Sequence, residues 1–268
     1  MNTQAPKLAP RAYLDRFRVT GRRAVVTGGG RGIGLACAEA LAEAGAEICI
    51  TDSDADIAGT GLAALKAKGF VARAEVFDVT DPAHVGEAAQ RLNRDWGLVD
   101  ILVCNAGIAR SDTPAEKVSD EHWRNVIDVN LNGVFWCCRA FGGPMLEAGR
   151  GAIVNVGSMS GFIVNRPQPQ SYYNASKAAV HHLTKSLAVE WAGRGVRVNA
   201  VAPTFIHTDG TAAVLGNPEA YAQVLAKIPL GRTGEPMDVA GAVVFLASPA
   251  ARMISGASLL IDGGWTSV

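Results

Sequence analysis

In this chain of 268 residues, 25 lysines and arginines balance 25 aspartates and glutamates, so the formal net charge is zero. Proteins that bind nucleic acids or anionic membranes usually carry a basic surplus or patch, and no run of four basic residues occurs here. Hydrophobic residues make up 49% of the chain and charged residues 19%, which excludes a disordered protein and allows a large buried core.

The sequence also lacks the usual signals for export or membrane insertion. The first 20 residues hold no apolar stretch of the length a secretory signal needs, and no uncharged apolar window is long enough to span a bilayer. We therefore expect a soluble, cytoplasmic protein. Its five cysteines form no C-x-x-C pair and are an odd number, so we expect neither a disulfide framework nor a zinc site.

Short apolar runs rich in β-branched residues alternate with longer segments of helical period along the whole chain. Runs of this kind that are apolar throughout are typical of strands buried on both faces of a parallel sheet. The pattern predicts an α/β fold in which a seven-stranded parallel sheet is covered by helices on both faces, a doubly wound arrangement. The expected strands are 24–27, 47–51, 71–77, 101–105, 152–156, 196–202 and 258–261, and the clearest helices are 172–192 and 237–247.

No linker, repeat or low-complexity stretch divides the chain. Residues 1–20 are predicted to be an N-terminal tail and residues 21–268 a single catalytic domain. The least regular part, from Pro203 to about residue 217, follows the sixth strand. Ligands bind at the carboxyl edge of such sheets, so a lid is predicted at about 203–228.

A glycine-rich loop follows the first strand directly and opens a helix. Its sequence is Thr27-Gly-Gly-Gly-Arg-Gly-Ile-Gly34, and the second strand closes with an acidic residue, Asp52. Glycines let the backbone turn tightly and let a pyrophosphate approach the amides at the helix N-terminus. In this context the loop predicts a dinucleotide-binding site.

Asp52 favours NAD over NADP. A carboxylate there can accept hydrogen bonds from both ribose hydroxyls, whereas a 2′-phosphate would meet a like charge. At roughly 4 Å that repulsion is about 1 kcal/mol in water and about 4 kcal/mol at an intermediate dielectric. Arg31 points the other way, because a guanidinium beside the loop can bind a phosphate; Ser53 offers no second positive charge.

Tyr173 and Lys177 form a Y-x-x-x-K pair at helical spacing, so their side chains share one face of a helix. Lowering the pKa of a tyrosine by about three units requires roughly 4 kcal/mol. One ammonium at about 4 Å in an intermediate dielectric supplies that much. The pair can therefore act as a proton donor and acceptor near neutral pH.

Together with these features, further motifs make the sequence resemble the short-chain dehydrogenase/reductase family from about Gly21 to the end, which implies a Rossmann domain. The motifs that carry the resemblance are the glycine loop, Asp78-Val79, Asn105-Ala106-Gly107, Asn130, Ser158, Tyr173 with Lys177, and Ile261-Asp262-Gly263-Gly264.

The resemblance implies four catalytic residues. Tyr173 exchanges a proton with the substrate oxygen, and Ser158 hydrogen-bonds that oxygen. Lys177 lowers the pKa of the tyrosine and holds the nicotinamide ribose, while Asn130 anchors a water on the proton path. Hydride passes directly between nicotinamide and the carbinol carbon, so no catalytic metal is expected.

The resemblance also implies the cofactor contacts. Asp78 is expected at the adenine amino group, Asn105 along the adenosine side, and Ile206 and Thr208 at the carboxamide. The full expected set is Gly28, Arg31, Gly32, Ile33, Asp52, Asp78, Val79, Asn105, Ala106, Gly107, Tyr173, Lys177, Pro203, Thr204, Ile206 and Thr208.

Two departures from the family pattern bear on the substrate. Thr204 follows Pro203 where the family often has glycine, and the step from Ser158 to Tyr173 is about two residues longer than usual. The segment around these residues is similar to the polyol dehydrogenase and ketose reductase branch, which implies a polyol or ketose substrate. Candidate substrate contacts are Ser158, Ser160, Asn165, Tyr173 and Thr204, although Ser160, Asn165 and Thr204 are equally explained as residues that bond their own loops.

Alternatives remain open beside an NAD-dependent polyol oxidoreductase. One is an NADPH-dependent carbonyl or 3-oxoacyl reductase of the same fold, and another is a catalytically silent nucleotide-sensing or scaffold subunit. The resemblance implies a homotetramer, in which helices at about 119–148 and 172–192 pair across subunits. His181 and His182, just beyond Lys177, are interpreted as core or interface histidines because neighbours on a helix face different directions.

Overall fold

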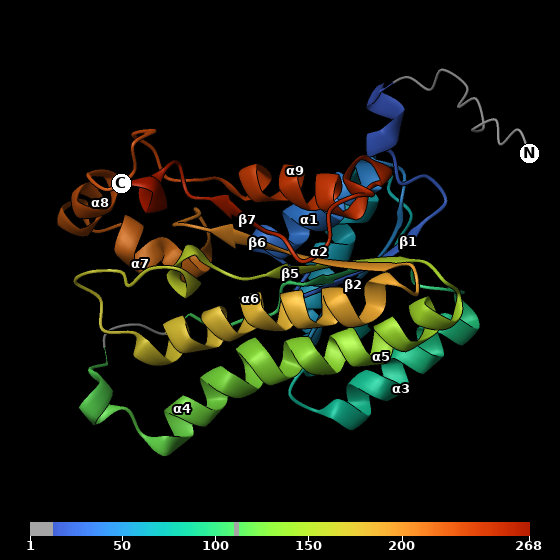
Figure 1. Ribbon diagram of the computed structural model, residues 1–268, viewed down its shortest axis with the longest axis horizontal. Helices are drawn as coiled ribbons and strands as arrows, with labels where there is room; N and C mark the ends of the chain where they lie inside the picture. The colour runs from blue at the N-terminus through green and yellow to red at the C-terminus, as the bar shows by residue number, and fades with distance from the viewer. Residues whose placement is uncertain (1–12, 110–112) are drawn as a thin grey trace, which may run out of the picture.

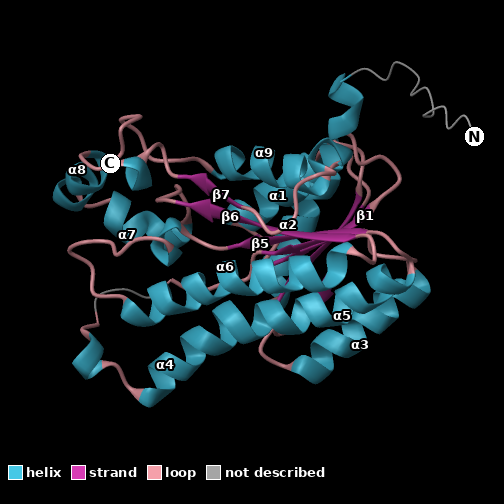
Figure 2. Ribbon diagram, viewed as in Figure 1, coloured by secondary structure: helices cyan, strands magenta, loops and turns pink. Residues whose placement is uncertain are grey.

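The computed structural model describes residues 13–109 and 113–268, and its centre is a seven-stranded sheet in which every paired strand is parallel (Figures 1 and 2). The strand order is β3-β2-β1-β4-β5-β6-β7. The chain therefore reverses its direction of winding between β1 and β4, where ligands bind in open sheets of this kind. The strands are β1 (Arg23–Thr27), β2 (Glu47–Asp52), β3 (Ala72–Val76), β4 (Ile101–Cys104), β5 (Gly151–Val156), β6 (Val196–Pro203) and β7 (Ser258–Ile261).

Helices cover both faces of the sheet, as the alternating pattern predicts. In Figure 1, α3, α5 and α6 lie below the sheet, and α1 and α9 lie above it. Each layer encloses its own apolar core, one on each face of the sheet, and alternate residues of β1, β2, β4 and β5 enter the two cores. The longer helices are α1 (Gly32–Glu43), α2 (Ala55–Ala67), α3 (Pro82–Asp95), α4 (Asp120–Ile127), α5 (Gly133–Glu147), α6 (Ser171–Ala192), α8 (Pro218–Leu225) and α9 (Pro236–Ala247).

Local sequence signals explain where these helices begin and end. Asp81 and Asn217 cap α3 and α8 by accepting hydrogen bonds from the next backbone amides, and each is followed by a proline in the first turn. Gly45 and Gly149 follow α1 and α5 with positive φ angles of 102° and 67°. A left-handed residue of this type ends a helix, and glycine adopts it without strain.

The segments at the two predicted boundaries are more ordered than the sequence suggests. Residues 1–12 of the predicted tail lie outside the described residues, but Tyr13–Phe17 form a 3-10 helix and Val19 is buried in the core. The stretch after β6 contains two short helical segments, Asp209–Thr211 and α7 (Ala212–Leu215), ahead of α8. Figure 1 shows α7 and α8 beyond the carboxyl ends of β6 and β7, where the lid is predicted.

No helix in the described residues has both the length and the apolar character needed to cross a bilayer. In the same part of the chain, no three His, Cys, Asp or Glu side chains gather into a metal-binding group.

Candidate active site

A cavity of about 680 Å³ opens at the carboxyl edge of the sheet. It runs from the glycine loop and the end of β2, past the end of β4, to the ends of β5 and β6. All sixteen residues expected around a dinucleotide line it, together with Ser158. The sequence motifs are therefore assembled around one space, although they are spread over most of the chain.

The shape of the glycine loop depends on the absence of side chains. Gly28 and Gly32 have positive φ angles of 59° and 54°. A Cβ on Gly34 would collide with the carbonyl oxygen of Gly28 and with the side-chain amide of Asn105. The loop consequently folds back on the first turn of α1 and leaves that helix end facing the cavity, where backbone amides favour a pyrophosphate.

Asn105 braces this loop from the neighbouring strand end. Its Nδ2 donates to the carbonyl oxygens of Thr27 (2.9 Å) and Gly28 (2.8 Å). In return, the Thr27 hydroxyl oxygen accepts hydrogen bonds from the backbone amides of Asn105 (3.0 Å) and Ala106 (3.1 Å). Asn105 lines the cavity as expected, but its side-chain amide is used to hold the loop in place.

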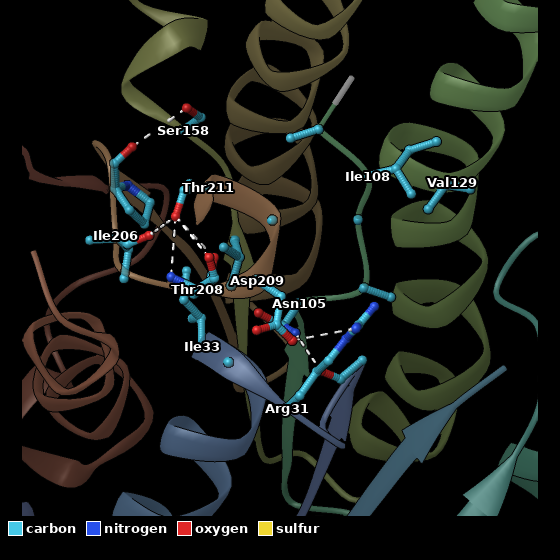
Figure 3. A pocket seen from close by; sticks show the side chains of 18 of the residues that line it. Arg31, Ile33, Asn105, Ile108, Val129, Ser158, Ile206, Thr208, Asp209 and Thr211 are labelled. Carbon is cyan, nitrogen blue, oxygen red and sulfur yellow. Dashed lines mark hydrogen bonds and ion pairs between the residues drawn. The ribbon is translucent and has the colours of Figure 1, made fainter. Parts of the chain in front are cut away.

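The guanidinium of Arg31 is turned toward the lid segment. Its Nη1 lies 3.5 Å from the Asp209 carboxylate, an ion pair across the mouth of the cavity (Figure 3). Both side chains are largely exposed, so the pair contributes little to stability. The pair matters for the choice of cofactor, because the Arg31 guanidinium, which could bind a 2′-phosphate, already lies next to a carboxylate.

Asp52 ends β2 at the opposite end of the cavity from Ser158. Its Oδ1 accepts only a long hydrogen bond, 3.3 Å, from the backbone amide of Asp54. Next to it, the hydroxyl of Thr51 is buried and has no hydrogen-bond partner among the described residues. Thr51 and Asp52 both line the cavity at the end of β2, where the expected adenosine ribose would lie.

Tyr173, Ser158 and Lys177 line the other end of the cavity. Ser158 follows β5, and its hydroxyl accepts a hydrogen bond from the Ser160 amide (3.1 Å) and lies 3.5 Å from the Pro203 carbonyl oxygen (Figure 3). Burial raises the pKa of Tyr173, and a hydrogen bond with Ser158 lowers it. The net effect is a raised pKa for Tyr173, whereas the sequence analysis expects Lys177 to lower this pKa.

Lys177 is 5% exposed, and its ammonium lies 5.8 Å from the centre of the Tyr173 ring. Its Nζ donates to the carbonyl oxygen of Val156 (2.9 Å). Burial lowers the pKa of Lys177 from 10.5 to about 8. The ammonium is thus held next to the cavity at a cost in stability, which is common for a functional group.

We expect Lys177→Met to be more stable than the wild type at pH 7, by about 2 kcal/mol. A pKa lowered from 10.5 to about 8 corresponds to roughly 3 kcal/mol of destabilisation by the buried charge, and losing the bond to Val156 offsets about 1 kcal/mol. The unfolded chain binds more protons above pH 8, so wild-type stability rises toward that of the variant as pH increases to about 10.5. Urea unfolding from pH 7 to 10 measures this, and a pH-independent difference would contradict it.

Asn130 lies behind the cavity wall and does not line it. It belongs to a π-helical turn, Asp128–Asn132, that joins α4 to α5. Its Oδ1 accepts from the Ile108 amide (2.8 Å), and its Nδ2 donates to the Ile108 carbonyl (2.9 Å) and to the Ser176 hydroxyl (3.2 Å). The side chain therefore ties the segment after β4 to α6, and it leaves no side-chain hydrogen for a water.

The three candidate substrate residues outside the catalytic set are placed differently from one another. Ser160 and Asn165 are buried away from the cavity lining, and the Ser160 hydroxyl donates to Asn165 Oδ1 (3.0 Å). This bond supports the alternative that they shape their own loop. Thr204 does line the cavity, and its buried hydroxyl has no partner among the described residues. Of the three, Thr204 alone lines the cavity.

The structure adds residues that the motif comparison missed. They enter the cavity because they are next to motif residues in the chain or on the facing lid, and only their position after a strand could have indicated them. They are Thr51, Ser53, Phe77, Ile108, Ala109, Val129, Val156, Gly157, His207, Asp209, Gly210 and Thr211.

The residues present fit a nicotinamide dinucleotide. The fit rests on the loop that a Cβ at Gly34 would obstruct and on two cavity-lining residues, Thr51 and Thr204, whose buried hydroxyls have no partner among the described residues. The glycine loop would hold the pyrophosphate and Asp52 the adenosine ribose. Tyr173 and Lys177 would lie at the nicotinamide end.

Comparisons with known proteins agree with this geometry. A family model described as Enoyl-(Acyl carrier protein) reductase matches residues 28–266. A galactitol 2-dehydrogenase of Rhizobium johnstonii is 53% identical over 95% of this chain and 99% of that protein, and the L-tagatose-forming galactitol 2-dehydrogenase of Cereibacter sphaeroides is 49% identical over 95% and 98%. A crystal structure of a gluconate 5-dehydrogenase from Burkholderia cenocepacia, in complex with NADP and tartrate, superposes with a TM-score of 0.92 at 38% identity, covering 96% of this chain and all of that one.

Proposed function

The chain belongs to the short-chain dehydrogenase/reductase family, and on this premise we propose that it is an NAD-dependent oxidoreductase that interconverts a secondary alcohol of a polyol and the corresponding ketose. The observation that carries the proposal is the cavity that joins Asp52 and the glycine loop to Ser158, Tyr173 and Lys177. The two relatives named as galactitol 2-dehydrogenases support the polyol class.

In the proposed mechanism, Tyr173 removes the hydroxyl proton of the alcohol and returns it in the reverse direction. Ser158 donates a hydrogen bond to the reacting oxygen and so sets its distance from the phenol. The nicotinamide, when bound, takes up the hydride from the carbinol carbon. The Lys177 ammonium supplies positive charge beside the tyrosine, and this charge favours the phenolate that removal of the substrate proton requires.

The proposal assigns the choice of NAD to Asp52, with Arg31 held by Asp209. We expect Asp52→Asn to raise the ratio of kcat/KM with NADP⁺ to that with NAD⁺ by about 5- to 1,000-fold, since removing the carboxylate removes a repulsion of roughly 1 to 4 kcal/mol. Initial rates with each cofactor measure the ratio.

Asp56→Asn is the matched control for this prediction. Asp56 lies in the first turn of α2, carries the same charge and does not line the cavity. The NADP⁺-to-NAD⁺ ratio of kcat/KM in this variant should stay within about twofold of the wild type, because a solvent-exposed charge outside the cavity is largely screened. Equal ratios for the two variants would remove Asp52 from the proposal.

Thr204 is the proposed substrate contact beside the reacting oxygen, because it lines the cavity and its buried hydroxyl has no partner among the described residues. A polyol brings several hydroxyl groups that lose water on binding and need partners in the site. The Thr204 hydroxyl is one such partner; it follows Pro203 at the position where the family pattern often has glycine. A hydroxyl at this point favours a polyhydroxylated substrate over an apolar carbonyl compound.

We also propose that the chain assembles as a homotetramer. Apolar side chains are exposed on the two helices that the family resemblance pairs across subunits, among them Trp123 on α4 and Val189 on α6, and Leu259 and Leu260 on β7 are partly exposed as well. In such an assembly these side chains would be buried between subunits. Light scattering of the purified protein tests the mass of the assembly.

The experiment that tests the function follows absorbance at 340 nm with purified protein, NAD⁺ or NADP⁺, and galactitol, xylitol, arabinitol, sorbitol, mannitol and simple secondary diols. Turnover of a polyol with NAD⁺ is the expected result. Activity only with NADP⁺ would overturn the assignment of the cofactor. Silence across the panel despite NADH binding would favour the second candidate, an NADPH- or NADH-linked reductase of bulkier carbonyl or 3-oxoacyl compounds.

A further inference from the structure

The imidazole of His181 lies directly beneath the segment that carries Ser158. His181 is one turn beyond Lys177 on α6 and is 5% exposed. Its Nε2 lies 2.8 Å from the carbonyl oxygen of Ser158, and its Nδ1 lies 3.0 Å from the hydroxyl of Ser258 at the start of β7. One side chain therefore joins three elements, α6, the end of β5 and β7.

The short contact fixes the tautomer of the ring. A carbonyl oxygen only accepts, so Nε2 must carry the hydrogen, and Nδ1 of the neutral ring then accepts from the Ser258 hydroxyl. Nε2 also lies 3.5 Å from the backbone amide of Ser158, which would require the opposite role. The 2.8 Å contact decides, because a hydrogen bond at 3.5 Å is weak.

Nothing around His181 favours its charged form strongly. Burial lowers the pKa of His181, and the nearby ammonium groups of Lys177 and Lys185 lower it further, while the bond to the Ser158 carbonyl raises it. The net direction is downward. This direction favours the neutral ring, and the two hydrogen bonds are compatible with that form.

The loop is built around this ring. A Cβ on Gly157 would come within 2.8 Å of Nε2, and a Cβ on Gly161 would come within 2.6 Å of Cδ2. Phe162 covers the ring, with the two ring centres 4.4 Å apart. Glycines at both ends of the segment let its backbone lie against the imidazole, so the ring supports the whole stretch that carries Ser158.

We propose that His181 is a positioning residue for the reaction: its Nε2–H holds the backbone of Ser158, and through it the Ser158 hydroxyl, at the distance from the Tyr173 phenol that proton transfer needs. This inference rests on the proposed function. It differs from a role as core filler, because it depends on a donor at the ε position and not only on the volume of the ring.

Two substitutions separate the donor from the volume. In His181→Gln, the amide nitrogen reaches about as far as Nε2 and can still donate to the Ser158 carbonyl. In His181→Asn, the shorter amide stays near the position of Nδ1 and can meet Ser258, but it leaves the Ser158 carbonyl without a donor. His182→Asn is the matched control, since the adjacent residue is the same type and is exposed.

We expect His181→Asn to lower kcat by about 10- to 100-fold, the size of effect that a displacement of about 1 Å in a catalytic group produces. His181→Gln should stay within about threefold of the wild type, and so should His182→Asn. The dissociation constant of NADH should change by less than about twofold in all three, because the cofactor contacts are untouched. Amide hydrogen exchange should increase in residues 157–162 of His181→Asn only.

The outcomes separate this inference from the proposed function. Equal losses in His181→Asn and His181→Gln, or kcat of His181→Asn equal to that of His182→Asn, would overturn it. If the wild type turned over no substrate, the proposed function would fail, and hydrogen exchange at residues 157–162 would still decide whether His181 holds the loop. If His181→Asn did not fold, Ser258→Ala would carry the same exchange test, with an increase in that segment expected and no increase overturning the role.

Discussion

Tyr173→Phe should lower kcat by about 1,000-fold or more while leaving NADH binding within about twofold of the wild type. In the proposed mechanism the phenol is the group that takes and returns the substrate proton, and a positioned acid or base contributes about 10²- to 10⁴-fold. The ring itself remains to line the cavity, so the cofactor contacts persist. Initial rates with the best polyol, together with fluorescence titration of NADH, measure both quantities.

The neighbouring residue supplies the control for this prediction. Tyr172 is fully buried, and its hydroxyl has no hydrogen-bond partner among the described residues. Tyr172→Phe therefore removes the same atom from the next position without removing a bond, and kcat should stay within about threefold of the wild type. Comparable losses in the two variants would mean that the helix end and not the Tyr173 proton matters.

Gly34→Ala should weaken NADH binding by at least about 100-fold and destabilise the protein by about 1 to 3 kcal/mol, the usual cost of forcing an extra methyl group into a packed site. The added Cβ falls on the Gly28 carbonyl and on the Asn105 amide, so the glycine loop and its brace must move apart. That movement displaces the backbone that faces the pyrophosphate. Fluorescence titration of NADH and thermal unfolding measure the two effects.

Gly59→Ala is the control for the glycine loop. Gly59 lies within α2, and a Cβ there meets nothing within 4 Å. Alanine is the better helix former by about 1 kcal/mol, so this variant should be slightly more stable and should bind NADH as the wild type does. Unchanged NADH affinity in Gly34→Ala would show that the loop tolerates the methyl group and would contradict the proposal that this loop holds the pyrophosphate.

The strands could be predicted because the sheet is buried on both faces. β4 and β5 are apolar almost throughout and are buried along their length, so their composition alone separates them from amphipathic helices. The structure confirms seven parallel strands and helices on both faces. Val19 was missed because one apolar residue in a polar segment carries no periodic signal, although it packs in the core.

The motif residues that line the cavity could be predicted because short local patterns carry them: a glycine spacing, an acid at a strand end and the i, i+4 pair of Tyr173 and Lys177. Contacts between distant residues have no such signature. Nothing in the sequence links Asn105 to the carbonyl oxygen of Gly28, or Ser160 to Asn165, because these bonds depend on where loops meet in space.

The contacts of His181 also could not be predicted from the sequence. Its spacing from Lys177 places it on the same face of α6, and the sequence supported only an interpretation as a core or interface residue. The structure places its ring against Ser158 and Ser258, from two separate strands. Only the folded arrangement of β5, α6 and β7 reveals that a residue outside every family motif contacts the segment that carries a catalytic one.

The order of strands in the sheet divides the residues of the candidate site into two groups. Asp52 and the glycine loop belong to β1 and β2, on one side of the point where winding reverses, while Ser158, Tyr173 and Thr204 belong to β5, α6 and the end of β6 on the other. Under the proposed function, mutations that alter coenzyme choice and mutations that alter substrate choice would fall in separate stretches of the gene. Selection could then change one trait while the other is retained.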